Sequence, residues 1–313
     1  MARPHVPDEI LTLAHERSAA RAARNWNEAD RLRSEIEAAG WKVVDRGTDF
    51  ALEPAHPPTI EDAGVVRYGS SSAVPSQLDE PDAGIATVVL VATDWPGDLT
   101  RALDGLGRHA PAGTSIVVVA DGASDEQEAT LADERHGLEV VRTSERLGTG
   151  SAWNVGLRRA IGPVVVILDT SVEPTGDVVS PLVAALDDPS VGVAGGFGIE
   201  SADLRRFIDA PPGDVTAIEG YAIAFRRVDA AARGPIDERF RFYRNLDIWW
   251  SLVLRDEGEG SPPRRAVSVS IPATRHEHRG WTSLPEDERD RLSKRNFYRI
   301  IDRFGPRRDL ATG

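Results

Sequence analysis

The sequence predicts an α/β fold with a mostly parallel sheet and helices on both faces. Short valine-rich apolar runs alternate with segments of helical spacing, and buried strands separated by helices form βαβ units. A helix between the first two strands is indicated by Leu99, Ala102, Leu103 and Leu106, which recur on one face. Ligands of such sheets bind where the strands end, so the loops after the strands are the expected functional edge. The expected strands span residues 87–92, 115–120, 138–142, 164–168 and 191–194.

Composition excludes several classes of protein. The 313 residues contain no cysteine, which rules out disulfides and cysteine-zinc sites and agrees with a reducing cytoplasm. The net charge of -13 argues against general nucleic-acid binding, because phosphate contacts need clustered Lys and Arg. No apolar run approaches the roughly 20 residues of a membrane helix, and the N-terminus lacks the apolar core of a secretory signal. We therefore expect a soluble cytoplasmic protein.

Three sections are expected along the chain: a helical module at residues 1–53, a linker at 54–84 and a globular domain at 85–313. In the module, Asn25 and Glu28 form a capping-box pattern at a helix start, and Gly40 is a typical residue for the helix end. A strand at 41–45 and a turn at Gly47 and Thr48 follow. Pro, Ala, Ser, Gly and Asp dominate the second section, which is a linker composition.

The helical module carries a spaced pattern that resembles the C-terminal piece of cysteinyl-tRNA synthetases. The catalytic domain of those enzymes, with its zinc ligands and ATP-binding motifs, is missing from the sequence, so the resemblance does not imply aminoacylation. A helical hairpin used for packing or dimerisation is the favoured interpretation, and RNA contact is the alternative. The matching residues are Arg17, Ala20, Arg21, Asn25, Trp26, Ala29, Asp30, Leu32, Arg33, Ile36, Gly40, Val44, Asp45, Gly47 and Thr48.

A second ordered pattern occupies residues 217–258. An apolar strand ends in Arg226 and Arg227, a Gly-x-x-Asp-Glu-x-Phe turn follows, and Asp247 stands at the head of an amphipathic helix closed by Gly258. This order resembles the acceptor-side half of family 2 glycosyltransferases, and the resemblance extends over residues 85–305. It implies the GT-A fold and the transfer of a sugar from a nucleotide-diphosphate donor to an acceptor hydroxyl.

The resemblance implies that Asp247 occupies the position of the family's catalytic base. Inverting transfer needs one carboxylate that takes the proton of the acceptor hydroxyl as its oxygen attacks the anomeric carbon. The competing roles for this residue are a helix N-cap and an ion pair with Arg244. Glu219 and Tyr221 resemble the acceptor-lining segment of the family, with a buried hydrogen-bonded acid as the alternative for Glu219. Aromatic faces commonly stack on sugars, so Trp249 is a candidate acceptor platform, with core packing as the alternative.

On the donor side, the resemblance implies contacts from the loops that follow the strands. A glycine-containing loop that runs into a helix suits an anionic diphosphate, because backbone amides can approach it there. The alternatives are a plain helix cap for Asp94 and a turn cap for Asp169. The expected donor-binding residues are Thr93, Asp94, Asp121, Gly148, Asn154 and Asp169.

A divalent metal, Mn or Mg, is implied by the segment that begins at Asp169. The segment resembles the DxD site of the family, where hard oxygen ligands hold a hard cation beside phosphates, although Ser171 stands in place of the second Asp. Glu173 could assist, and His278 or His276 corresponds to the late histidine of metal-dependent relatives. The competing interpretation is a turn cap and a structural histidine pair.

Other functions stay open at this stage. They are an inactive sugar-nucleotide-binding or scaffold protein with the same fold, an RNA-linked factor and a nucleotidyltransferase. The acceptor is expected to be a glycan, a lipid or a protein, and the helical module could mediate a homo-oligomer. A helix expected at 285–304 has Phe297, Ile300, Ile301 and Phe304 on one side. That side would pack on the core or, alternatively, dock at the inner face of a membrane.

Overall fold

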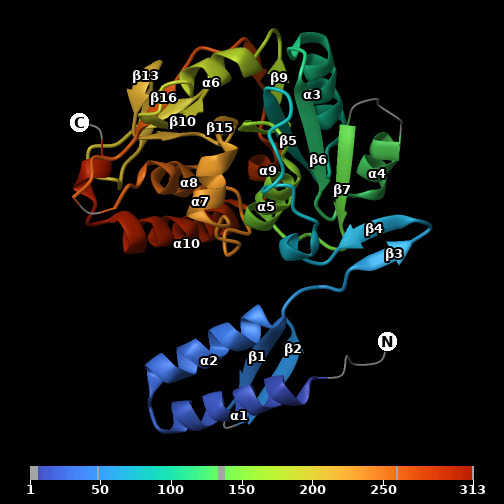
Figure 1. Ribbon diagram of the computed structural model, residues 1–313, viewed down its shortest axis with the longest axis vertical. Helices are drawn as coiled ribbons and strands as arrows, with labels where there is room; N and C mark the ends of the chain where they lie inside the picture. The colour runs from blue at the N-terminus through green and yellow to red at the C-terminus, as the bar shows by residue number, and fades with distance from the viewer. Residues whose placement is uncertain (1–5, 48, 133–137, 259, 312–313) are drawn as a thin grey trace. The chain divides into compact units, whose positions relative to one another are not determined.

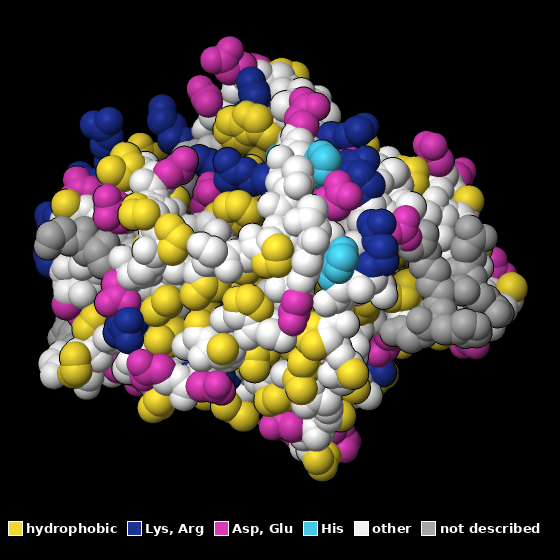
Figure 2. Space-filling view, turned by 90° about the horizontal axis from the view of Figure 1, so that it is seen from above, with side chains coloured by type: hydrophobic (Ala, Val, Ile, Leu, Met, Phe, Trp, Pro, Cys, Tyr) yellow, Lys and Arg dark blue, Asp and Glu magenta, His cyan; other side chains and the backbone are white. Residues whose placement is uncertain are grey.

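The computed structural model describes residues 6–47, 49–132, 138–258 and 260–311. The chain forms two compact units, Met1–Thr59 and Ile60–Gly313. Every helix within the described ranges is too short or too polar to span a lipid bilayer. On the face drawn in Figure 2, basic, acidic and apolar side chains are intermingled. The net negative charge therefore does not gather into a single patch on that face.

The smaller unit is a pair of helices packed on a β-hairpin. Asn25 accepts a hydrogen bond from the Glu28 amide at 3.3 Å, so the predicted cap forms. Gly40 has φ +83°, a conformation that favours glycine at a helix end. Thr48, assigned to a turn by the sequence, lies outside the described residues. The elements are α1 (Asp8–Ala22), α2 (Trp26–Ala38) and the antiparallel strands β1 (Trp41–Arg46) and β2 (Asp49–Pro54).

An ion pair connects the first helix to the first strand of this unit. Arg17 is buried and donates two hydrogen bonds to Asp45, at 2.8 and 3.1 Å. Both residues belong to the pattern shared with the synthetases, so part of that pattern serves the fold of the unit. The small apolar core around this pair consists of Ile10, Ala14, Ile36 and Val43.

The larger unit is built on a sheet that counts ten strands within the described ranges (Figure 1). Its strands are β3 (Ile60–Asp62), β4 (Val65–Tyr68), β5 (Ala86–Ala92), β6 (Thr114–Ala120), β7 (Leu138–Thr143), β8 (Val164–Leu168), β10 (Val191–Gly195), β13 (Gly213–Val215), β15 (Ala222–Arg226) and β16 (Arg265–Ser268). Their order is β13-β16-β10-β15-β8-β5-β6-β7-β4-β3. The run from β8 to β4 is parallel, and β15 is antiparallel to both of its neighbours.

Eight helices of the larger unit lie in the described part of the chain. They are α3 (Pro96–His109), α4 (Asp125–Ala132), α5 (Thr149–Arg159), α6 (Val179–Ala185), α7 (Arg227–Arg233), α8 (Leu246–Arg255), α9 (Arg279–Thr282) and α10 (Glu286–Phe304). Two short 3-10 helices, Ser71–Ala73 and Arg308–Leu310, complete the helical content. Helices α3 and α6 lie on one side of the sheet, and α5, α8 and α10 lie on the other (Figure 1).

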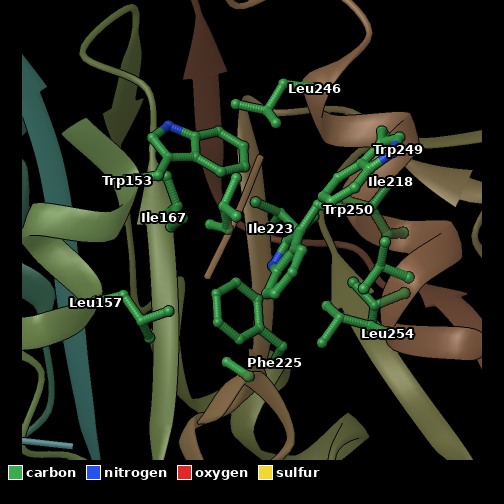
Figure 3. Close-up of a cluster of buried hydrophobic side chains, with 14 of the residues drawn as sticks. Trp153, Leu157, Ile167, Ile218, Ile223, Phe225, Leu246, Trp249, Trp250 and Leu254 are labelled. Atoms are coloured by element: carbon green, nitrogen blue, oxygen red, sulfur yellow. The ribbon is translucent and has the colours of Figure 1, made fainter. Parts of the chain in front are cut away.

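The strands are apolar on both faces because helices cover both faces. Along β5, Val88 and Leu90 belong to the core beneath α3 and α6, whereas Val89 belongs to the core beneath α5 and α8. Figure 3 shows Trp153 from α5 and Trp250 from α8 directed toward the central strands of the second core. The predicted α/β class, with a mostly parallel sheet covered on two sides, is confirmed.

The strands expected from the sequence agree with β5, β6, β7, β8 and β10 to within one residue at each end. Two small sheets were not expected, because strands of two or three residues are too short to show a period. One pairs β9 (Val172–Pro174) with β17 (Ala273–Arg275). The other joins β11 (Gly198–Glu200) to β12 (Ile208–Ala210) and β14 (Ala217–Ile218).

Much of the segment expected as a linker, residues 54–84, belongs to the larger unit. Strand β4 extends the sheet beside β7, and β3 pairs with β4. The buried Arg227 guanidinium donates to the carbonyls of Gln77 and Glu80, at 2.7 and 2.6 Å, and to the carboxylate of Asp82 at 2.6 Å. A buried guanidinium needs such partners. The bonds hold residues 77–82 in the larger unit, although the composition of this segment predicts a flexible linker.

Candidate active site

A cavity of about 420 Å³ opens at the carboxyl ends of β5 and β8. The loops after these two strands form one wall, and residues 219–221, which precede β15, form the next. Because β15 pairs antiparallel with β8, its preceding loop lies beside the end of β8, and the Asp169 amide donates to the Tyr221 carbonyl at 3.0 Å. The start of α8 and residues 278–284 close the remaining sides.

Asp247 lines the cavity from the first turn of α8. Its Oδ2 accepts a hydrogen bond from the Gly220 amide at 2.7 Å, and its Oδ1 accepts one from the Ile248 amide at 2.9 Å. Burial raises the pKa of Asp247 above its usual value, and the Gly220 bond and the charge of Arg244 offset this only in part. The N-cap position belongs to Asn245, so capping is not the main role of Asp247.

Asp169 and His278 come from different sides of the cavity and meet within it. His278 Nε2 lies 3.3 Å from Asp169 Oδ2, and Ser171 binds Asp169 Oδ1 through its amide at 2.8 Å and through its hydroxyl. Burial by itself would raise the pKa of Asp169, but the hydrogen bonds from His278 and Ser171 outweigh it and lower the pKa. For His278, burial would lower the pKa, and its contact with Asp169 raises it instead.

Glu219 is a second acid that lines the cavity. Burial and the nearby charge of Asp247 raise the pKa of Glu219 from 4.5 to about 6, although Arg275 pairs with its Oε2 at 3.2 Å. The Arg275 guanidinium also lies over the ring of Tyr221, 4.6 Å from its centroid. Tyr221 lines the cavity next to Glu219, so both predicted acceptor residues occupy one wall.

Replacement of Glu219 by glutamine should change how stability depends on pH. The folded-state pKa of about 6 lies above the ordinary 4.5, so this carboxyl contributes stability below pH 4.5 and loses that contribution as pH rises through about 6. The free energy of unfolding of the wild type minus that of Glu219→Gln should fall by about 2 kcal/mol between pH 4.5 and about pH 7. Urea denaturation of both proteins measures this. A difference that stays constant over this range, as for the exposed control Glu286→Gln, would contradict the prediction.

On the donor side, Thr93 and Asp94 line the cavity as the sequence predicts. Asp94 pairs with Arg146, which follows β7 and also lines the cavity, at 2.8 Å. A guanidinium held at the strand ends by one carboxylate can still donate to phosphate oxygens, because it carries five N–H groups.

Three other predicted donor residues lie outside the cavity lining and stabilise the loops behind it. Asp121 is buried, and its carboxylate accepts the amides of Leu147 and Gly148 at 2.7 and 3.0 Å. Gly148 has φ +99°, and a Cβ there would meet the Arg241 backbone at 2.7 Å, so the position requires glycine. Asn154 is buried too, and its side chain bonds both the amide and the carbonyl of Ile236, each at 2.8 Å.

Trp249, predicted to bind the acceptor, does not reach this cavity. Its ring packs against Phe240 with a centroid distance of 5.4 Å, and Trp250 packs edge-on against Phe225. Helix α8 is buried on nearly all sides, and residues two apart on a helix point about 200° from each other. Since Asp247 faces the cavity, Trp249 faces the opposite way.

The five predicted metal ligands separate into two groups. Asp169, Ser171 and His278 line the cavity, whereas Glu173 and His276 pair with each other at 2.8 Å outside its lining. Strands β9 and β17 explain the second pair, because their antiparallel pairing places the two side chains together. In the described part of the chain, no three His, Asp or Glu residues are arranged to hold a metal ion on their own.

The cavity also contains residues that the sequence did not identify as ligands. The ring of Tyr243 stacks on His278 at a centroid distance of 4.0 Å, and burial raises the pKa of Tyr243. Phe242, Tyr243 and Arg244 all line the cavity, directly before α8. A run of aromatic and arginine side chains immediately upstream of Asp247 could have identified these residues. An interpretation that considers only the helix that follows misses them.

The wall formed by residues 242–245 is held by α10. The buried Asn296 side chain donates to the carbonyls of Phe242 and Arg244 at 2.8 and 2.9 Å. Asn245, which has φ +70°, donates from its side chain to the Ser293 carbonyl at 3.0 Å. These bonds fix the backbone that leads into Asp247.

Comparison with known families agrees with this geometry. Residues 87–231 match the family model described as glycosyl transferase family 2. The matched segment contains β5 to β8, β10 and β15 and therefore the donor side of the cavity. Asp247 and His278 lie beyond it.

Two solved structures have the same fold as the larger unit. GalNAc-T7 with UDP, GalNAc and Mn2+ aligns with a TM-score of 0.54 and 17% identity, over 72% of this chain and 48% of that chain. The mannosyltransferase PcManGT from Pyrobaculum calidifontis, in complex with GDP-Man and Mn2+, aligns with a TM-score of 0.55 and 19% identity, over 76% of this chain and 71% of that chain. The fold is GT-A, as predicted.

The smaller unit matches a different group of proteins. It is 47% identical over 53 residues to the cysteine–tRNA ligase of Opitutus terrae, and 47% identical over 51 residues to that of Chlamydia trachomatis. The chain spans 12% and 11% of the length of these two relatives. The resemblance seen in the sequence is therefore confirmed, for a short piece of those proteins.

Proposed function

We propose that the larger unit is a family 2 glycosyltransferase that moves a sugar from a nucleoside-diphosphate sugar to an acceptor hydroxyl. One observation carries the proposal: Asp247 and the Asp169–His278 pair, which are far apart in sequence, line one cavity at the strand ends. The family match of residues 87–231 supports it. So do two structures of the same fold, whose names include UDP with GalNAc and GDP-Man.

Asp247 is the base in this proposal. Its two hydrogen bonds from Gly220 and Ile248 hold the carboxylate in one orientation toward the cavity. The raised pKa makes it a better proton acceptor than a solvated aspartate. The acceptor oxygen attacks the anomeric carbon, the bond from that carbon to the diphosphate breaks, and the carboxylate takes the hydroxyl proton. Attack from the face opposite the diphosphate inverts the configuration.

Asp169 and His278 would hold a divalent cation on the donor side. Their facing atoms, Oδ2 and Nε2, lie 3.3 Å apart, so both could bind the same ion. Since no three His, Asp or Glu residues of the described part are grouped to hold a metal, donor oxygens and water would supply the remaining ligands. When bound, the cation stabilises the charge that develops on the departing diphosphate.

A panel of nucleotide sugars tests the function directly. The full chain is mixed with UDP- and GDP-sugars, with and without Mn²⁺, and its melting temperature is recorded. A true donor present at about 100 times its dissociation constant should stabilise the fold by about 2.7 kcal/mol. Release of the nucleoside diphosphate in the presence of acceptor candidates then reports transfer.

Two outcomes of this test would contradict the proposal in different ways. Binding of a nucleotide sugar without release of nucleoside diphosphate, even by hydrolysis, would indicate the alternative, an inactive sugar-nucleotide-binding or scaffold protein. The single carboxylate at the metal position, with Ser171 in place of the second one, is the observation that favours this alternative. If no member of the panel stabilises the protein, the sugar-nucleotide site itself is refuted.

A further inference from the structure

A second cavity, of about 430 Å³, lies on the other side of α8. It is bounded by the turn at residues 235–239, by Trp249 and by the C-terminal half of α10, which runs alongside α8 (Figure 1). No lining residue is shared with the first cavity. Three guanidinium groups surround this hollow, those of Arg239, Arg299 and Arg303.

The lining carries three arginines and two acids, Asp237 and Asp302, so the acids leave one positive charge uncompensated. Asp237 is bound by Arg239 at 2.9 and 2.7 Å, and Asp302 is exposed. The described residues offer no carboxylate partner to Arg299, whose Nε is buried without a hydrogen-bond partner. Arg303 lies over the Trp249 ring, 5.2 Å from its centroid, and is likewise unpaired in the described structure.

Helix α10 places like charges side by side at this point. Arg295, Arg299 and Arg303 follow one another at intervals of four residues and so occupy one face of the helix. Like charges at this spacing destabilise a helix. Burial and the charges of Arg239 and Arg295 lower the pKa of Arg299, with Asp237 opposing them. The arginine cluster is therefore under electrostatic strain that an anion would relieve.

We propose that this second cavity binds a phosphate group, carried by a soluble phosphate or by the headgroup of an anionic phospholipid. Guanidinium groups match phosphate geometry, and each of the three can donate to a different phosphate oxygen, whereas a carboxylate offers only two oxygens. The stack of Arg303 on Trp249 keeps one guanidinium oriented along the cavity wall. The site is separate from sugar transfer, because α8 carries Asp247 on one side and Trp249 on the other.

The test uses the full chain and inorganic phosphate as the probe, titrated against chloride of equal ionic strength. The wild type should bind phosphate, and the double variant Arg299→Gln/Arg303→Gln should bind it at least about ten-fold more weakly, since two charge-assisted contacts are removed. The control Arg205→Gln/Arg206→Gln removes the same charge from an exposed pair elsewhere and should bind like the wild type. If the double variant is unstable, the single variant Arg303→Gln replaces it in the test, because Arg303 is exposed and its replacement should leave the fold intact. It should also bind phosphate more weakly than the wild type.

A vesicle arm distinguishes the two sources of the phosphate group. If the ligand is a lipid headgroup, the wild type should sediment with phosphatidylglycerol vesicles but not with phosphatidylcholine vesicles, and the double variant should lose this preference. If the ligand is soluble, phosphate binding depends on the two arginines and vesicle binding does not occur. Binding of neither probe by the wild type would overturn the proposal, and so would equal binding by the double variant.

Discussion

Replacement of Asp247 by asparagine should lower the rate of sugar transfer by about 10²–10⁴-fold, the contribution expected of a positioned general base. Asparagine keeps the size of the side chain and one oxygen that can accept the Gly220 amide, so the wall of the cavity should keep its shape. What is lost is the group that receives the hydroxyl proton. Donor binding should stay within a few-fold of the wild type, because the residues proposed to bind the donor lie on other loops of the cavity.

Single-turnover transfer and equilibrium donor binding, measured on the same preparation, separate these two effects. Asp287→Asn, an exposed change on α10, is the control and should leave both quantities unaltered. A normal rate of sugar transfer by Asp247→Asn would show that Asp247 is not the base. Loss of donor binding together with transfer would instead mean that the substitution had disturbed the cavity.

The second large effect is expected from replacing Asp169, the proposed metal ligand. Asp169→Asn should abolish the Mn²⁺-dependent part of nucleotide binding, because the neutral amide lacks the negative charge with which a carboxylate attracts a hard cation. At 100 times the wild-type dissociation constant, the wild type gains about 2.7 kcal/mol of stability from the ligand, and the variant should gain almost none. Melting temperatures with UDP or GDP, with Mn²⁺ or with a chelator, measure the difference.

Glu173→Gln is the matched control for this experiment. Glu173 belongs to the sequence pattern that predicts a metal site, yet it pairs with His276 outside the cavity lining. Its variant should keep the full Mn²⁺ effect. The reverse outcome, in which Asp169→Asn keeps the Mn²⁺ effect and Glu173→Gln loses it, would indicate that the metal binds at the β9–β17 sheet instead.

The central strands of the large sheet could be predicted because most of them are short, valine-rich apolar runs that are largely buried. β8 is an example, five apolar residues that end at Leu168. The strands that flank the site could not be predicted. Strands β9 and β17 have three residues each, and each forms only by pairing with the other, which is distant in sequence. The 54–84 segment was misjudged for a similar reason. Its order depends on the buried Arg227, which composition does not reveal.

The order of motifs was sufficient to find Asp169, Glu219, Asp247 and His278, because strand-end residues of such a sheet converge on one edge. Sequence could not say which way a loop residue points. Asp121 follows a strand as Asp169 does, yet its carboxylate turns inward to the amides of the next loop.

A related limit applies to α8. Its residues are buried on nearly every side, although the sequence predicts an amphipathic helix, so no exposed face marks the side that lines the cavity. Trp249 was therefore predicted at the acceptor from its aromatic ring and its position next to the base. Its true environment, under Arg303, depends on a helix that comes some fifty residues later (Leu246–Arg255 against Glu286–Phe304).

The hydrogen bonds from α10 to residues 242–245 have a consequence for any shortened version of the protein. The segment that matches the family model stops at residue 231, so a fragment trimmed to it would retain Asp169 and lack Asp247 altogether. A fragment that ends before Glu286 would include Asp247 but not Asn296, which braces the stretch leading into it. A piece able to rebuild the pocket must therefore include helix α10 together with the central strands.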